Sequence, residues 1–248
     1  MQLNDFFRQN PRIADAFSGG VDSSYLLHAA KAAKCDVRAY FIKSEFQPQF
    51  ELDDAVRIAS HIDASLIIDR FSILSEPSVT CNASDRCYFC KTAIIKRIRE
   101  LARSDGFSVL CDGSNADDDE ADRPGMRALY ELGVVSPLRE SGLGKSEIRL
   151  LSDQAGLFTH DKPAYACLAT RIPTGTKITA EMLETIERAE TALFDMGFSD
   201  FRVRLIPPFT AKIQVSDGQW DEAVARRSEI IESLSSGFSD VVLDLKGR

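Results

Sequence analysis

Short apolar segments alternate with helical patterns along the chain from residue 12 to about residue 157. Residues 13–17, 37–42 and 64–69 have the length and composition of strands, and residues 23–34 carry apolar side chains at helical spacing. Strands that alternate with helices are typical of a parallel sheet joined by crossover helices. The pattern therefore predicts an α/β domain in this part of the chain.

Further elements extend this domain. A strand over residues 108–111 runs into a polar turn, and apolar spacing predicts helices over residues 94–101, 124–132 and 145–155. The polar turn therefore lies beyond the carboxyl end of a strand.

The pattern changes towards the C-terminus. Thr179 is placed to cap a helix. Residues 201–206 and 210–215 read as paired strands around two prolines, followed by a helix from Asp217 and a last strand over residues 241–245. This order predicts a small α+β domain.

The sequence thus indicates two domains of unequal size. We expect the larger one to comprise residues 1–165 and the smaller one residues 166–248. The join falls within residues 158–178, which are rich in Pro, Gly and Thr and show little periodicity.

Composition and charge narrow the class of protein. Apolar residues make up 44% and charged residues 27% of the 248 residues, as in ordinary globular proteins. A formal net charge of −8 disfavours a broad nucleic-acid surface. Apolar runs fall far short of a membrane helix, and the first residues lack the basic and apolar segments of a secretory signal. We expect a cytoplasmic protein with reduced thiols and no membrane partner.

A glycine-rich loop follows the first strand. It contains Ser18, Gly19, Gly20, Asp22 and Ser23 and leads directly into a helix. A strand, such a loop and a helix N-terminus together direct backbone N–H groups at an anion, while serine hydroxyls donate further hydrogen bonds and an aspartate can hold Mg²⁺. The whole hexapeptide resembles the loop of the PP-loop ATP pyrophosphatases, which predicts binding of ATP and its pyrophosphate.

The cysteines have an informative spacing. Cys87 and Cys90 are separated by two residues, the spacing that lets two sulfurs ligate one centre. With Cys167 they could hold an iron–sulfur cluster, or a zinc ion with a further ligand; alternatively, the spacing is accidental. Cys35 and Cys111 are interpreted as packing residues, and Cys81 as an uninvolved thiol.

Several longer segments resemble one family within this superfamily. They are DGSNADD at residues 112–118, RPGMRAL at 123–129, SPL at 136–138, GLGKSEIR at 142–149, DKPA at 161–164 and ACLATRIP at 166–173. Over nearly its full length the chain resembles LarE, the ATP-dependent sulfur transferases that make pyridinium-3,5-bisthiocarboxylic acid mononucleotide for the nickel-pincer cofactor of lactate racemase. The resemblance implies a Rossmann-like domain of the adenine nucleotide α-hydrolase type, with ATP and Mg²⁺ as cofactors.

The resemblance also implies a substrate and a reaction. The substrate is a pyridinium carboxylate mononucleotide, whose carboxylate is adenylated with release of pyrophosphate and then attacked by sulfur. Relatives of this family assemble into homo-oligomers, so we expect the same of this chain.

Residue roles follow from the matched positions. Arg171 is suited to a phosphate or carboxylate, and Arg202 and Arg204 match a phosphate-binding pair of the family. Glu190 lies where a family metal-site glutamate is expected, as a second Mg²⁺ ligand besides Asp22. Residues 205–208 depart from the family pattern, because Leu, Ile and two prolines replace the expected polar residues.

Two sources of sulfur are implied by the family. In members with one cysteine, the residue matching Cys167 gives up its own sulfur and is left as dehydroalanine. In members with three, the residues matching Cys87, Cys90 and Cys167 hold a [4Fe-4S] cluster whose open iron carries sulfide from an external source. We favour the cluster because three thiolates suit iron–sulfur chemistry.

Three rival functions share some of these features. A tRNA-thiolating enzyme also combines such a loop with three cysteines, but the acidic charge balance disfavours it. An amide-forming ligase leaves the Cys87 and Cys90 spacing unexplained, and a nucleotide sensor predicts no release of pyrophosphate.

Overall fold

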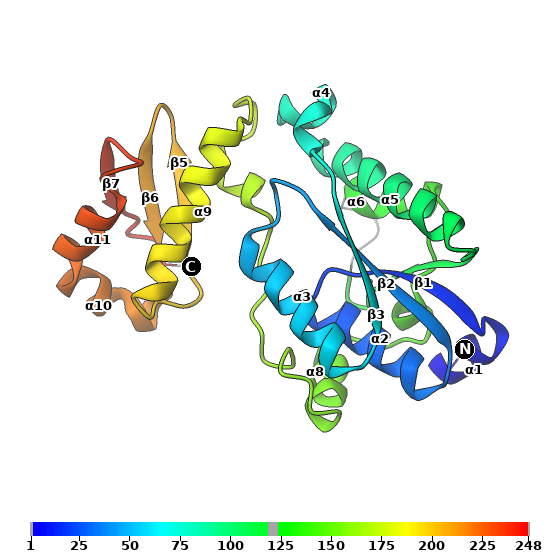
Figure 1. Cartoon of the computed structure of the whole chain (residues 1–248). Coiled ribbons are helices and arrows are strands. Elements are labelled where there is room, and N and C mark those ends of the chain that lie inside the picture. Colours follow the sequence, from blue (N-terminus) through cyan, green and yellow to red (C-terminus); the bar gives the residue numbers. More distant parts are fainter. Residues whose placement is uncertain (1, 119–123, 248) are drawn as a thin grey trace. The chain divides into compact units, whose positions relative to one another are not determined.

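The apolar segments of the N-terminal part form a parallel sheet with the strand order β3-β2-β1-β4 (Figure 1). The structure is a computed structural model that describes residues 2–118 and 124–247. The strands are β1 (Arg12–Ala16), β2 (Asp36–Lys43), β3 (Ser65–Arg70) and β4 (Leu110–Asp112). The α/β fold class predicted from the sequence is confirmed.

Helices cover both faces of this sheet and enclose a separate apolar core on each. One core includes residues of α2 (Val21–Ala32), α3 (Gln49–His61) and α8 (Lys145–Gln154). The other includes residues of α5 (Arg86–Ser104) and α6 (Pro124–Glu131). The shorter elements are α1 (Leu3–Gln9), η1 (Ile73–Ser75) and α7 (Pro137–Glu140). The β1–α2 and β4 turns thus meet at the carboxyl edge of the sheet, the place where open α/β sheets bind ligands.

A second sheet lies in the C-terminal part and has the order β5-β6-β7. Its β5–β6 pair is antiparallel and its β6–β7 pair is parallel. The elements are α4 (Pro77–Thr80), η2 (Leu168–Arg171), α9 (Ala180–Asp195), β5 (Arg202–Ile206), β6 (Thr210–Gln214), η3 (Asp217–Gln219), α10 (Trp220–Ala225), α11 (Arg227–Leu234) and β7 (Asp240–Leu243). The predicted pairing of strands around the two prolines is confirmed.

The chain divides into two compact units, and the C-terminal one includes an internal segment. The first unit comprises Met1–Ile73 and Asp85–Ala164, and the second comprises Leu74–Ser84 and Tyr165–Arg248. The domain boundary after residue 165 remains a sequence-based prediction, which did not anticipate that residues 74–84 group with the C-terminal residues.

Hydrogen bonds explain this grouping. Gly175 N donates to Asn82 O over 2.8 Å, and Ile178 N donates to Thr80 O over 2.8 Å. The buried Asn82 side chain in turn donates to Pro173 O over 2.9 Å. Backbone and side-chain bonds therefore attach the short α4 segment to the loop before α9.

Local signals account for some element ends and miss others. The Thr179 hydroxyl accepts a hydrogen bond from Met182 N, which confirms the predicted cap of α9. The single helix expected from Asp217 is wrong: a 3₁₀ turn, α10 and α11 replace it, with a break at Arg226. The N-terminal helix α1 was not predicted.

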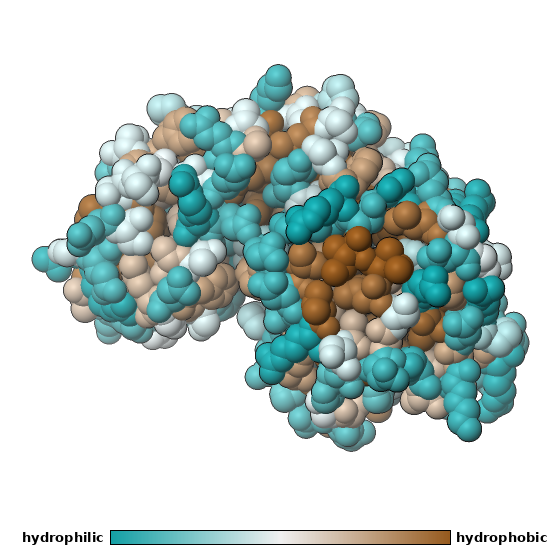
Figure 2. Space-filling view, in the orientation of Figure 1, coloured by the Kyte–Doolittle hydropathy of each residue, from teal (hydrophilic) through white to brown (hydrophobic). Residues whose placement is uncertain are grey.

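Strand β3 forms an edge of the parallel sheet, and apolar surface gathers around it in the space-filling view (Figure 2). Ile68 of this strand is 42% exposed. Open strand edges are places where other chains can pair; the expected homo-oligomer remains a prediction. Within the described ranges, no helix is both long and apolar enough to cross a bilayer.

Candidate active site

The phosphate loop connects β1 to α2 and leaves the helix N-terminus open to a ligand. Gly19 adopts a φ of +72°, and a Cβ at this position would lie 3.2 Å from Ala55 of α3. Gly20 is the N-cap residue of α2 and provides no side-chain cap. Uncapped N–H groups in a first turn, together with the helix dipole, form a binding site for phosphate.

The two loop serines contact each other. Their hydroxyl oxygens lie 3.1 Å apart, and Ser23 Oγ donates to Gly20 O over 3.2 Å. Ser18 N also donates to Ser23 Oγ over 3.3 Å. This arrangement fixes the loop conformation from within.

A second glycine brings the turn after β4 against the same helix. A Cβ on Gly113 would lie only 2.7 Å from Ser23 N and 2.9 Å from Ser23 Cα. No side chain fits at this distance, so the close approach of the turn after β4 to helix α2 requires glycine here.

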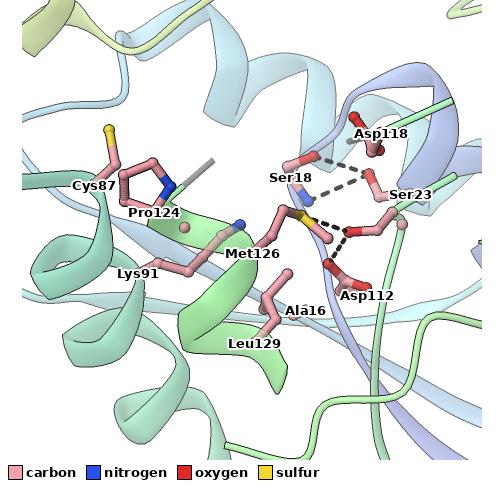
Figure 3. A pocket seen from close by; sticks show the side chains of 13 residues that line it. Ala16, Ser18, Ser23, Cys87, Lys91, Asp112, Asp118, Pro124, Met126 and Leu129 are labelled. Atoms are coloured by element: carbon pink, nitrogen blue, oxygen red, sulfur yellow. Dashed lines mark hydrogen bonds between the residues drawn. The ribbon is translucent and has the colours of Figure 1, made fainter. Parts of the chain in front are cut away.

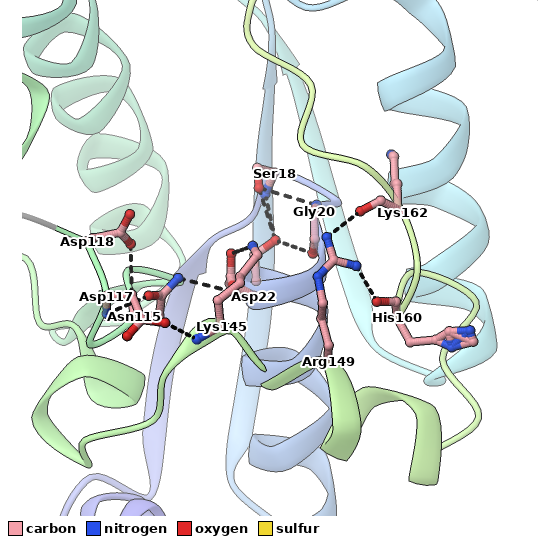
Figure 4. A network of polar contacts seen from close by, with 11 residues as sticks. Ser18, Gly20, Asp22, Asn115, Asp117, Asp118, Lys145, Arg149, His160 and Lys162 are labelled. Carbon is pink, nitrogen blue, oxygen red and sulfur yellow. Dashed lines mark hydrogen bonds and ion pairs between the residues drawn. The ribbon is translucent and has the colours of Figure 1, made fainter. Parts of the chain in front are cut away.

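The loop aspartate is held by residues from two further segments (Figure 4). Lys145 Nζ donates to Asp22 Oδ2 over 2.5 Å, and Asn115 Nδ2 donates to Asp22 Oδ1 over 3.4 Å. Lys145 is the first residue of α8, and its backbone N donates to Asp117 Oδ2 over 2.6 Å. The site therefore combines a carboxylate, an amide and an ammonium beside the phosphate loop.

The segment containing the DKPA motif is attached to this unit by cations. Arg149 Nη2 donates to Lys162 O over 2.8 Å, and Arg149 also binds His160 O. Lys162 Nζ lies 2.6 Å from Asp54 of α3.

A pocket of about 410 Å³ extends from the loop to the cysteine helix α5 (Figure 3). Ser18 and Ser23 line one part of it, and Cys87 and Lys91 line another. The remaining lining residues are Ala16, Asp112, Gly113, Ser114, Asp118, Pro124, Gly125, Met126 and Leu129. The glycine-rich loop, a cation and a thiol thus open into one pocket.

Two buried carboxyl groups lie at the strand ends below the loop. Asp112 accepts hydrogen bonds from the hydroxyls of Ser114 over 2.6 Å and Ser136 over 2.7 Å. Asp15 is fully buried, and neither of its carboxyl oxygens has a hydrogen-bond partner among the described residues. Burial, and then the charge of Asp112, raise the pKa of Asp15 well above its usual value.

The first two cysteines of the predicted set lie in the first turn and a half of α5. Cys87 is exposed and Cys90 is half-buried. Arg86 Nη2 lies 3.8 Å from Cys87 Sγ. Cys90 follows Cys87 by three residues, so both thiols project from the same side of the helix.

Cys167 belongs to the second unit and is half-buried. No group of three or more His, Cys, Asp or Glu side chains that could hold a metal ion occurs among residues 2–118 and 124–247. The cluster of three cysteines remains a prediction.

Cys35 and Cys111 lie in the core, as the sequence suggested. Burial, and to a lesser extent the charge of Asp36, raise the pKa of Cys35 to about 11. Such a thiol stays protonated and unreactive at neutral pH.

The motif arginine of the second unit is buried instead of facing solvent. Arg171 is 1% exposed and pairs with Glu190, which is 2% exposed, over 2.8 Å from Nε to Oε1. Glu190 Oε1 also accepts from Val203 N over 2.9 Å, and Glu190 Oε2 accepts from Arg171 Nη2 and from the Tyr165 hydroxyl. Each oxygen of Glu190 thus has two donors already.

The two strand arginines differ in their surroundings. Arg202 is buried and lies over the Tyr165 ring, 5.1 Å from its centroid. Arg204 is half-buried and, with Lys212 of β6, lines a pocket of about 410 Å³ in the second unit. Arg171 also contributes to the wall of this pocket. The structure therefore supplies a third cation, Lys212, beside apolar residues 205 and 206.

Sequence reasoning gave no role to several residues of these sites. Lys145 and Gly113 lie within the family motifs, but the motifs do not show their contacts. Lys212 alternates with apolar residues in a predicted strand, and nothing else in the sequence marks it as a site residue. The motif residue Arg123 lies outside the described residues.

Comparisons with known proteins identify relatives of nearly full length. No protein-family model matches the chain, so its place in the PP-loop superfamily remains a prediction. An uncharacterized protein of Synechocystis sp. is 35% identical over 99% of this chain and 92% of its own length. The pyridinium-3,5-bisthiocarboxylic acid mononucleotide synthase of Lactiplantibacillus plantarum is 30% identical over 95% of this chain and 86% of its own. An uncharacterized protein of Methanocaldococcus jannaschii is 28% identical over 96% and 91%, respectively.

Proposed function

Because the chain belongs to the family of the pyridinium-3,5-bisthiocarboxylic acid mononucleotide synthase, LarE, we propose that it is an ATP-dependent sulfurtransferase acting on a pyridinium carboxylate mononucleotide. The observation that supports this most directly is the pocket lined by both the phosphate loop and Cys87. Activation of a substrate and delivery of sulfur to it require these two groups near one another.

ATP makes the carboxylate reactive. A carboxylate oxygen attacks the α-phosphorus of ATP, the bond to the β-phosphate oxygen breaks, and pyrophosphate leaves. The uncapped backbone N–H groups in the first turn of α2 and the hydroxyls of Ser18 and Ser23 stabilise the charge on the departing pyrophosphate, and Lys145 adds a cation. Asp22 has the chemistry to hold Mg²⁺, which would neutralise phosphate charge when bound.

Sulfur then replaces AMP. The sulfur of a sulfide ion attacks the carbonyl carbon of the adenylate, the bond from this carbon to the phosphate oxygen breaks, and AMP leaves with a thiocarboxylate as the product. We propose that Cys87, Cys90 and Cys167 hold a [4Fe-4S] cluster that supplies the sulfide. Their accessible thiols suit this donor set, since iron–sulfur clusters are held by cysteine thiolates.

The phosphate of the mononucleotide is assigned to the second unit. Arg204 and Lys212 line one pocket there together with Thr174, whose side chain carries a hydroxyl group. Cations and a hydroxyl donor in one concave site suit a phosphate. Residues 205–208 lack the polar side chains of the family pattern, and Lys212 provides a cation in the same pocket.

Two measurements on anaerobically purified protein test this function. Pyrophosphate release that requires both ATP and the pyridinium carboxylate mononucleotide is expected, and its absence would contradict the proposal. Iron and acid-labile sulfide should be present in the wild type and lost in Cys90→Ala, and absence of iron from both would exclude the cluster.

Mass spectrometry after turnover distinguishes the two sulfur sources. With a replaceable sulfide, the peptide containing Cys167 keeps its mass. Loss of H₂S from that peptide would instead establish donation of the cysteine's own sulfur, the second mode known from the family resemblance. A Cys81→Ala variant is the matched control, because this exposed thiol is assigned no role.

A further inference from the structure

The segment that carries Cys167 is held by a buried ion pair. Arg171 binds Glu190 through two parallel hydrogen bonds, 2.8 Å from Nε to Oε1 and 3.0 Å from Nη2 to Oε2. Both side chains are almost fully buried. A bidentate pair of this kind fixes the orientation of the guanidinium plane.

The remaining nitrogen of this guanidinium points at the cysteine segment. Arg171 Nη1 donates to Ala166 O over 2.8 Å, to Thr170 Oγ1 over 2.8 Å, and, more weakly, to Cys167 O over 3.4 Å. Thr170 Oγ1 in turn donates to Cys167 O over 2.8 Å. The backbone on both sides of Cys167 is therefore held by one arginine and one threonine.

The carboxylate end of the pair is fixed by different elements. Glu190 lies on α9, and its Oε1 also binds the backbone N of Val203 on β5. Its Oε2 accepts from Tyr165, two residues before Cys167. Helix, strand and cysteine segment thus share one carboxylate.

We propose that Arg171 and Glu190 are positioning residues for Cys167, which set the direction of its thiol instead of binding substrate phosphate or Mg²⁺. This inference rests on the proposed sulfur transfer through Cys167. With the carbonyl of Cys167 fixed by Thr170 and Arg171, only rotation about χ1 remains to move the sulfur. A phosphate bound by Arg171 would have to break contacts of a side chain that is 1% exposed.

The test compares variants of Thr170, because substitution of this residue disturbs the buried ion pair less than substitution of Arg171. Thr170→Val removes the hydroxyl that links Arg171 to Cys167 O and keeps the side-chain shape, and Thr170→Ser restores the hydroxyl. Arg171→Lys is the stronger variant, but loss of the bidentate pair can prevent folding.

The readout is the alkylation rate of Cys167 by iodoacetamide, measured by peptide mapping on full-length protein of matched iron content. Thr170→Val should change this rate about fivefold, the factor expected for one lost hydrogen bond. Thr170→Ser should restore the wild-type rate, and the exposed Cys81 should react alike in all variants. An unchanged Cys167 rate in Thr170→Val would overturn the positioning role.

Steady-state kinetics separate this role from phosphate binding. If Arg171 and Thr170 position Cys167, we expect Thr170→Val to have a lower kcat and an unchanged KM for the mononucleotide. A raised KM in Arg171→Lys, with Cys167 alkylation as in the wild type, would assign the arginine to the substrate and overturn the inference. If wild-type protein transfers no sulfur but the alkylation rates still change as expected, the proposed function fails while the positioning contact stands.

Discussion

Lys145 Nζ lies 2.5 Å from Asp22 Oδ2, so the acid of the phosphate loop is bound to a cation that follows it by 123 residues in the chain. Helix α8 begins at this lysine, which anchors its backbone N to Asp117. Lys145 is thus held beside the loop through both its backbone N and its ammonium group.

Replacement of this lysine should therefore weaken nucleotide binding. Lys145→Met removes the ammonium and should raise the KM for ATP roughly 10- to 100-fold, since a hydrogen bond to a charged group contributes about 1.5–3 kcal/mol. Pyrophosphate release measured against ATP concentration tests this. The exposed Lys96 of α5 provides the control Lys96→Met, and equal KM values for both variants would contradict the assignment.

A second prediction follows from the close approach of Gly113 to α2. Gly113→Ala places a Cβ against the Ser23 backbone, so the loop or the strand end must shift. We expect a loss of about 1–3 kcal/mol in the free energy of unfolding, as for other overpacked sites, together with weaker ATP binding. Gly218→Ala, where a Cβ meets nothing within 4 Å, is the control in thermal unfolding. A wild-type Tm and ATP affinity in Gly113→Ala would show that the contact is not required.

The second-unit pocket predicts a selective effect on the mononucleotide. Lys212→Met should raise the KM for this substrate about tenfold, the loss of one charge-assisted hydrogen bond, and leave the KM for ATP unchanged. The exposed Lys177 serves for the control variant Lys177→Met. Equal changes in both KM values would argue against a substrate-phosphate site in this pocket.

The buried Asp15 predicts how stability depends on pH. Its pKa is raised in the folded state from an ordinary value of 3.8, so above pH 4 the unfolded chain loses this proton while the folded protein keeps it. The unfolded state then binds fewer protons, and the contribution of Asp15 to the stability falls as the pH rises above 4 until the raised pKa is passed.

Asp15→Val removes this dependence together with an unpaired polar group. We expect a gain of about 1–3 kcal/mol in the free energy of unfolding at pH 7, the cost of an unsatisfied buried group, and a smaller gain at pH 4. Urea unfolding at both pH values measures it. The exposed Asp221 provides the control Asp221→Asn. A gain that grows towards acidic pH would be incompatible with a raised pKa.

Local sequence signals were sufficient for the sheet and for one cap. Residues 13–17 and 37–42, which include most of β1 and β2, are short and mostly apolar segments interrupted by Asp15 and Arg38. Thr179 has the chemistry that an N-cap requires. The break at Arg226 was missed because it depends on a distant contact: the guanidinium binds Met196 O, 30 residues away, as well as Glu222 and Glu229.

The site residues could be predicted only where they lie close together in the sequence. The loop from Ser18 to Ser23 and the spacing of Cys87 and Cys90 are contiguous, so they stand out in the sequence. Gly113 is required because of a backbone that precedes it by 90 residues, and the burial of Arg171 depends on Glu190 in another element. A motif shows that an arginine is present but not whether its guanidinium faces a ligand or a carboxylate.

The interleaving of the two units affects the order in which the protein can fold during synthesis. Asn82 precedes its partner Ile172 by 90 residues, and at about 5–20 residues per second the ribosome needs roughly 5 to 18 seconds to make this stretch. Throughout that interval the first unit can complete its sheet, while the hydrogen bonds of residues 80–82 to Pro173, Gly175 and Ile178 cannot yet form. The second unit can complete its sheet only after β7 has been synthesised, so residues 74–84 leave the ribosome long before the rest of their unit.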